Sequence, residues 1–159
     1  MIFVVLGSQK FQFNRLLKSL DIAVENGLIT DSIFAQTGSS DYEPRNYEYS
    51  NFLDRDEYKN KLSQSDVVIC HGGTGVIVGA VKNNKKVIAI ARLSRYNEHV
   101  DDHQLQIINQ FAQANMISYV DEPDEIPGKL EEIKNITFEK YVSNQKTINN
   151  YLKEYIDSI

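Results

Sequence analysis

The sequence predicts an α/β fold in which an open, mostly parallel sheet carries helices on both faces. Short apolar runs rich in β-branched residues alternate with segments whose apolar residues recur at helical spacing, which is typical of such sheets. The strand-like runs are continuously apolar, as expected for strands buried on both faces. With 159 residues, the chain is about one domain long, and we expect a single domain over residues 1–159.

The first half of the chain is expected to contain three strands and two helices. Residues 2–6 form the first strand, which Gly7 and Ser8 end. A helix follows from Phe13 to Val24, because its apolar residues lie on one helical face, and Gly27 is its expected stop. The remaining elements are strands at 32–37 and 47–52 and a short helix at 56–63 that starts near Asp54 or Asp56.

The second half repeats the alternation. Strands are predicted at 67–70, 86–91 and 117–120, with helices at 75–83, 99–115 and 124–133. The core stripe of the 99–115 helix is predicted to be Leu105, Ile108, Phe111 and Ala112. A last helix at 138–156 has an apolar, tyrosine-rich face, which either packs on the domain itself or docks a partner chain.

Composition excludes several classes of protein. A net charge of −5 argues against nucleic-acid binding, which normally needs a basic face. The sequence has no apolar stretch long enough to cross a membrane and no basic N-terminal region of a signal peptide. Cys70, the one cysteine, is expected to be buried without a disulfide, as in a cytosolic protein. The Ser-His-Asp order, the P-loop lysine and the GxGxxG pattern are missing, which disfavours hydrolases, kinases and dehydrogenases.

A glycine-rich loop at 71–75 follows a buried strand and opens a helix. Its residues are His71, Gly72, Gly73, Thr74 and Gly75. The free N–H groups and the dipole of the helix suit a phosphate or diphosphate. The loop after the first strand, Gly7-Ser8, is expected at the same rim of the sheet, where the carboxyl ends of the parallel strands lie. His71 then makes a hydrogen bond or a cationic contact to a phosphate. The alternative is that His71 only makes hydrogen bonds to the backbone of the domain and that the glycines only form a turn.

The densest polar stretch runs from Arg92 to Gln104. If the helix begins at His99, then His99, Asp102 and His103 lie on one face. His99 and His103 are possible ligands of a zinc ion. However, Val100 stands where the metalloprotease motif needs Glu, and no third ligand is evident, so we predict no metal. The remaining alternatives are a solvated helix start and a site for a polar ligand such as a sugar, held by Asp102, His103 and Gln104.

Three of these segments resemble a known family. HGGTG at 71–75, KKVIAIARL at 85–93 and EHVDDHQ at 98–104 resemble the C-terminal, donor-binding domain of family 28 glycosyltransferases, which have the GT-B fold. The resemblance implies a Rossmann-like domain, the C-terminal half of a GT-B enzyme. The likeness is greatest to the small subunits of two-chain transferases, among them the cytosolic subunit of the dolichol-pathway UDP-GlcNAc transferase and bacterial capsule or exopolysaccharide subunits.

The resemblance also implies roles for the residues at the rim. The substrate is a UDP-sugar, and neither a cofactor nor a metal is needed. Gly7-Ser8 and the 71–75 loop approach the diphosphate, Asp102-His103-Gln104 holds the donor sugar, and the loop that begins at Arg92 flanks the nucleotide. Many relatives have a ribose-binding Glu where Gly79 stands, and Glu98 is the expected substitute. His71 and His99 are the candidates that assist proton transfer.

The family implies a partner as well. Members of this size act with a membrane-anchored glycosyltransferase subunit that binds a lipid-linked sugar acceptor, which places this chain in the cytoplasm at the membrane face. Without the partner, the exposed apolar surface favours self-association. Two rival functions remain: a non-catalytic subunit that enhances a partner transferase, and a nucleotide hydrolase that uses His99, Asp102 and His103.

Overall fold

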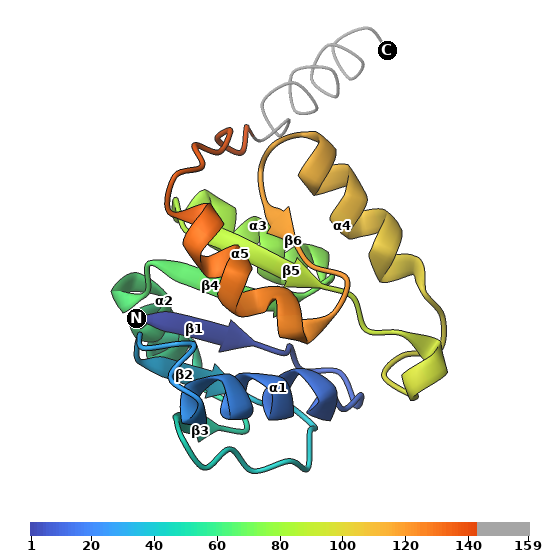
Figure 1. Cartoon of the computed structure of the whole chain (residues 1–159). Helices are drawn as coiled ribbons and strands as arrows, with labels where there is room; N and C mark the ends of the chain where they lie inside the picture. The colour runs from blue at the N-terminus through green and yellow to red at the C-terminus, as the bar shows by residue number, and fades with distance from the viewer. Residues whose placement is uncertain (143–159) are drawn as a thin grey trace, which may run out of the picture.

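A six-stranded parallel sheet forms the centre of the part of the chain that the structure describes, residues 1–142 of a computed structural model (Figure 1). The strand order is β3-β2-β1-β4-β5-β6, and every neighbouring pair is parallel. The strands are β1 (Ile2–Val5), β2 (Ile33–Gln36), β3 (Glu48–Ser50), β4 (Val67–His71), β5 (Lys86–Ile90) and β6 (Ser118–Tyr119). The predicted fold class is therefore confirmed.

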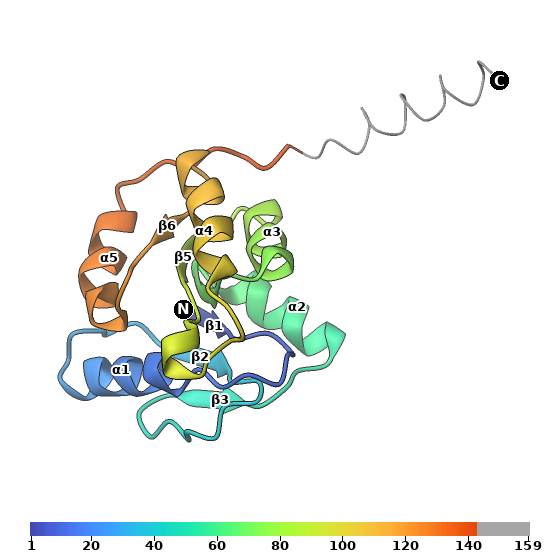
Figure 2. The same ribbon diagram turned by 90° about the vertical axis from the view of Figure 1, so that its right-hand side faces the viewer.

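Helices cover both faces of the sheet (Figure 2). They are α1 (Asn14–Glu25), α2 (Arg55–Gln64), α3 (Thr74–Lys82), α4 (His103–Gln113) and α5 (Ile126–Ile133), with 3-10 turns η1 (Ser94–Tyr96) and η2 (Pro123–Glu125). The buried side chains of α1 and α5 form one hydrophobic cluster, and those of α2, α3 and α4 form a second on the opposite face. Both faces of the central strands are consequently dry.

The side chains of β1 show how one strand serves both clusters. Ile2 and Val4 pack beneath α1 and α5, whereas Phe3 and Val5 pack beneath the helices of the other face. All four are buried, because successive side chains of a strand point to opposite faces. Cys70 of β4 is also fully buried and is not in a disulfide, as predicted. This core fixes β1 and β4 side by side, and their carboxyl ends lie at the same rim.

Local signals place most helices within one or two residues of their predicted starts. At α2, the Asp54 carboxylate accepts hydrogen bonds from the N–H groups of Asp56 and Glu57, while the Glu57 side chain accepts from the Asp54 N–H. This capping box satisfies backbone donors that a helix start would otherwise leave unpaired. Of Asp54 and Asp56, the two residues predicted near the start of this helix, Asp54 is the one that caps it.

The start of α4 was predicted wrongly. The helix begins at His103, four residues later than the predicted His99, and Glu98 and His99 before it make contacts with Arg15 and Phe11 instead. Leu105 was expected in the core stripe, but its side chain is exposed, and Gln104 and Ile108 are the buried residues of α4. The apolar stripe is therefore narrower than predicted, and a glutamine occupies its first position.

The C-terminal segment differs from the prediction where it is described. Residues 138–142 are not helical, and the rest of the helix expected at 138–156 lies outside the described residues. Phe138 and Tyr141 are partly buried and pack against the two hydrophobic clusters of the domain. Within residues 1–142, no helix has the length and the apolar character that crossing a membrane requires.

Candidate functional site

The candidate site lies at the carboxyl ends of β1 and β4. The strand order reverses between these two neighbours, and in open parallel sheets such a switch point opens a crevice where ligands bind. The loop after β1 begins with Gly7, whose φ of 72° is readily adopted only by glycine. The loop after β4 runs through Gly72 and Gly73 into α3. The structure therefore brings together the two glycine loops that the sequence singled out.

The N-terminus of α3 is open to a ligand. Gly73 is the capping residue, and no side chain caps the helix. Thr74 and Gly75, the first two residues of the helix, are exposed, and a Cβ added to Gly75 would meet open space. Uncapped N–H groups at an accessible helix start bind anions well, because the helix dipole adds to the hydrogen bonds.

The His71 imidazole fills the space between the two glycine loops. A Cβ on Gly7 would lie 2.7 Å from its Cε1, and a Cβ on Gly73 would lie 2.3 Å from its Nε2. Both distances are too short for any side chain, so the ring and the two glycines require one another. His71 is 6% exposed, and its Nδ1 lies 3.3 Å from the carbonyl oxygen of Val5. His71 thus joins the ends of β1 and β4.

Burial also sets the charge of His71. Desolvation, together with the positive charge of Arg92, lowers the pKa of His71 from 6.5 to about 4. The ring is therefore neutral at pH 7, which favours the predicted hydrogen bond to a phosphate over the cationic contact. Because the Val5 carbonyl can only accept, Nδ1 carries the proton and Nε2 a lone pair. His71 can still accept a hydrogen bond, and a role in proton transfer stays a prediction.

Gln104 connects the ends of β4 and β5. Its Oε1 accepts hydrogen bonds from the backbone N–H of Gly72 and from that of Arg92, each at 3.1 Å. The side chain is 2% exposed, and Gly72 packs so tightly against it that an added Cβ would lie 2.7 Å from the Gln104 Cβ. No described residue accepts a hydrogen bond from Nε2. The amide N–H group of Gln104 is therefore the part that a ligand can use.

Arg92 and Glu98 lie in the interior of the domain, beneath the loops of the rim. Both side chains are fully buried, although both were predicted to contact the nucleotide. The NH2 group of Arg92 donates to the carbonyls of Leu6 and Phe11, whereas its Nε and NH1 have no partner in the described structure. Burial lowers the pKa of Arg92 to about 10, so the group is still a cation at pH 7. It contributes positive charge close to His71 without facing the surface.

Arg15 is a residue of the site region that sequence reasoning missed. It projects from α1, and its Nε and NH2 donate to the two carboxylate oxygens of Glu98 at 3.0 and 3.1 Å. The same guanidinium donates to Glu122 and lies 4.5 Å from the centre of the Tyr96 ring. Glu98 is thus neutralised from a distant helix, which explains how a carboxylate can be fully buried. No local pattern links positions so far apart in sequence.

The other predicted sugar contacts lie at or just before the start of α4. Asp102 is exposed, and its Oδ1 accepts a hydrogen bond from the Ser94 N–H at 2.7 Å, which lowers the pKa of the carboxyl group. His103 is half exposed, whereas the His99 side chain is 7% exposed and packs on the ring of Phe11. His99 precedes the helix, so the predicted helical face of His99, Asp102 and His103 does not exist.

Comparison with known protein families shows the family of the chain. The sequence matches the glycosyltransferase family 28 C-terminal domain over residues 1–158. The chain belongs to this family. A comparison with curated proteins gives no match.

Two solved structures share the fold of this family 28 domain. One is the glycotransferase of kitacinnamycin, with a TM-score of 0.60, 18% identity, and coverage of 85% of this chain and 35% of that chain. The other is MurG of Acinetobacter baumannii, with a TM-score of 0.57, 16% identity, and coverage of 83% and 41%. The chain therefore spans well under half the length of either protein.

Gly79 of the family 28 domain lies one helical turn after Gly75, on the same side of α3. A Cβ added to either residue would meet open space. The position at which the family resemblance leads us to expect a ribose-binding Glu is therefore sterically free here. Glu98 is not a substitute, because it is buried and bound by Arg15.

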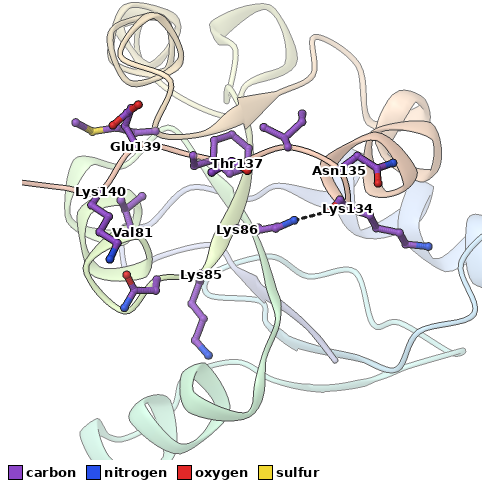
Figure 3. Close-up of a pocket in the computed structure, with 12 residues that line it drawn as sticks. Val81, Lys85, Lys86, Lys134, Asn135, Thr137, Glu139 and Lys140 are labelled. Atoms are coloured by element: carbon purple, nitrogen blue, oxygen red, sulfur yellow. Dashed lines mark hydrogen bonds between the residues drawn. The ribbon is translucent and has the colours of Figure 1, made fainter.

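A separate hollow of about 340 Å³ lies at the opposite, amino end of the strands (Figure 3). Two of its lysines, Lys85 and Lys86, are already engaged. Lys85 Nζ donates to two carbonyls at the end of α2, and Lys86 Nζ donates to the carbonyls of Ile133 and Lys134 at the end of α5. A cation at a helix C-terminus stabilises the helix dipole. These lysines therefore have a structural explanation, and the rim at β1 and β4 is the better candidate site.

Proposed function

We propose that this chain binds a UDP-sugar and is the donor-binding half of a hexosyltransferase. The observation that carries the proposal is Gln104, whose carbonyl oxygen is held by two buried N–H groups while its amide nitrogen stays free. A group fixed in this way, beside the open N-terminus of α3, is suited to a sugar hydroxyl next to a diphosphate. Membership in family 28 supports the same conclusion.

The proposed reaction needs little covalent chemistry from this chain. The acceptor hydroxyl oxygen forms a bond to C1 of the sugar, the bond from C1 to the diphosphate oxygen breaks, and UDP leaves. Charge that develops on the leaving diphosphate is stabilised by the N–H groups of Thr74 and Gly75 at the helix start. The proton of the acceptor hydroxyl passes to a base on the partner chain. No step requires a metal.

The acceptor site is proposed to come from a second, membrane-associated subunit. The described domain supplies one rim of loops, and a transferase needs a second surface to hold the acceptor. We propose a lipid-linked sugar as that acceptor, in capsule, exopolysaccharide or glycolipid synthesis. The chain would then act in the cytoplasm at the membrane face. The exposed side chains of Val100 and Leu105, which lie before and within the start of α4, are apolar groups that the partner or, in its absence, a second copy of the chain would cover.

The test compares two substitutions of Gln104. Glutamate keeps an oxygen that can accept from the two buried N–H groups but lacks the amide donor, whereas alanine removes both. We expect Gln104→Glu to keep the fold and to lose at least about tenfold in sugar transfer with the partner subunit, which corresponds to one lost hydrogen bond to the substrate. Full transfer by Gln104→Glu would overturn the sugar contact. Calorimetry with UDP, with ADP as the control, tests the nucleotide.

A non-catalytic enhancer subunit is the second candidate. The observation in its favour is Gly79, which removes the ribose-binding carboxylate of many relatives and leaves open space. An enhancer would raise the activity of a partner that already transfers sugar alone. Assaying the partner with and without this chain separates the two proposals, because a donor-binding half is required for any turnover.

A further inference from the structure

Three side chains of metal-ligand type converge at the start of α4, next to Gln104. The Nδ1 atom of His99 lies 3.2 Å from Oδ1 of Asp101, and Nδ1 of His103 contacts the same oxygen. One ligand atom from each residue lies within 4.8 Å of the others. The centres of the two imidazole rings are 5.0 Å apart.

This convergence exists because α4 begins late. In a continuous helix from His99, residues four apart share a side but a residue two positions along points away, so Asp101 would face the opposite direction. Here residues 99–102 form a turn, and the carboxylate comes round between the two histidines. The third ligand that the sequence pattern lacked is therefore Asp101.

One ligand is fixed and the other two can adjust. The His99 side chain is 7% exposed, and its ring packs on Phe11 with 4.7 Å between ring centres. The side chains of Asp101 and His103 are 56% and 50% exposed. Exposed side chains have room to rotate toward an ion beside the buried His99, and the exposed side leaves a coordination position for water or an anion.

The hydrogen bonding leaves negative potential inside the cluster. The backbone N–H of Asp101 donates to Nδ1 of His99 at 3.4 Å, so this nitrogen bears a lone pair. That lone pair lies 3.2 Å from Oδ1 of Asp101, which already accepts a hydrogen bond from the backbone N–H of His103 and contacts its Nδ1. The two facing acceptors, Nδ1 of His99 and Oδ1 of Asp101, still repel each other. A cation bound by both would remove the repulsion.

We propose that His99, Asp101 and His103 bind a divalent transition-metal ion, with zinc as the best match. Two imidazoles and one carboxylate are a ligand set that zinc accepts, and calcium or magnesium would need more oxygen atoms. Tetrahedral zinc at about 2.0–2.1 Å from each ligand requires ligand atoms about 3.3 Å apart. Rotation of the exposed Asp101 and His103 side chains reaches this spacing. The bound ion fixes the turn that presents Gln104.

Zinc titration of the untagged full chain, stripped with a chelator, tests the proposal. We expect one Zn²⁺ per chain by calorimetry and a visible absorption band with Co²⁺ in its place. Both His103→Gln and Asp101→Asn should weaken binding more than about tenfold, the loss that even an outer-shell change can produce. Asp102→Asn is the matched control, because it changes the adjacent carboxylate and keeps an oxygen that can accept from Ser94.

The assignment is simple to contradict because the chain has only three histidines and the third, His71, is buried between glycine loops. Absence of zinc binding by the wild type would overturn the proposal and leave a histidine–carboxylate cluster without a metal. Binding that survives in both ligand variants would overturn it too. The two substitutions are at exposed positions, and circular dichroism verifies their fold. The result does not depend on whether the chain binds UDP.

Discussion

The loops that follow β4 and β5 lie at the same rim but are built differently. The loop after β4 is short, and it is shaped by glycines on either side of the His71 ring. The segment from Arg92 to His103 after β5 is long and is held by distant partners: Arg15 binds Glu98, and the carbonyls of Leu6 and Phe11 bind Arg92. Steric fit thus shapes the first loop, whereas buried charge shapes the second.

If buried charge holds the second loop, removing Arg15 should have the largest effect. Arg15→Met leaves Glu98 buried without its cation, and we expect the free energy of unfolding to fall by about 3 kcal/mol. Urea unfolding measures this loss. Arg95→Met is the matched control: Arg95 pairs with Glu122 at the surface and should change stability by less than about 1 kcal/mol. Equal effects of the two substitutions would contradict the comparison.

The first loop should instead depend on pH through His71. Its pKa of about 4 in the folded chain lies below 6.5, the value for an unperturbed histidine, so the unfolded chain binds the proton more tightly. The contribution of neutral His71 is therefore complete above pH 6.5 and is lost as the pH falls to 4, by about 3 kcal/mol in total.

Urea unfolding at several pH values measures this dependence. Because carboxyl groups titrate in the same range, the His71→Gln variant is the reference. We expect its stability to fall less steeply between pH 6.5 and 4 than that of the wild type. Identical slopes would show that His71 is not buried in its neutral form.

Steric fit in the first loop predicts a further contrast between two glycines. Gly73→Ala places a Cβ 2.3 Å from the His71 Nε2, and we expect it to cost about 1–3 kcal/mol of stability and to weaken UDP binding. Gly75→Ala, two residues away, meets open space and should leave stability unchanged or raise it by up to about 1 kcal/mol. Thermal or urea unfolding distinguishes them, and similar losses for both would contradict the steric account.

The smallest expected effect concerns Gly79 on α3. Gly79→Ala and Gly79→Glu should both stabilise the domain by about 0.5–1 kcal/mol, since each removes a glycine from a helix interior without a clash. Only the glutamate can reach a ribose, so we expect it alone to strengthen UDP binding, by a few-fold for one added hydrogen bond. An equal UDP affinity of the two variants would argue against a ribose near Gly79.

The same contrast explains what the sequence could predict. The parallel sheet, the two glycine loops and the position of α3 follow from local signals: apolar runs, glycines and helical spacing. The start of α4 does not, because Glu98 and His99 are drawn out of the helix by Arg15 and Phe11, which are more than 80 residues away. The burial of Arg92 likewise depends on distant partners, the carbonyls of Leu6 and Phe11. Asp101 escaped notice because its place beside the histidines depends on the turn.

The most direct test of the central claim is to map UDP binding on the ¹⁵N-labelled chain by NMR. The account predicts saturable shifts of the backbone amides of Gly72 to Gly75 and of the side-chain amide of Gln104, with ADP producing weaker changes. The amides around Lys85 and Lys86, at the opposite end of the sheet, should not move. Shifts centred on those lysines, or the same response to ADP as to UDP, would contradict a uridine nucleotide site at the rim of β1 and β4.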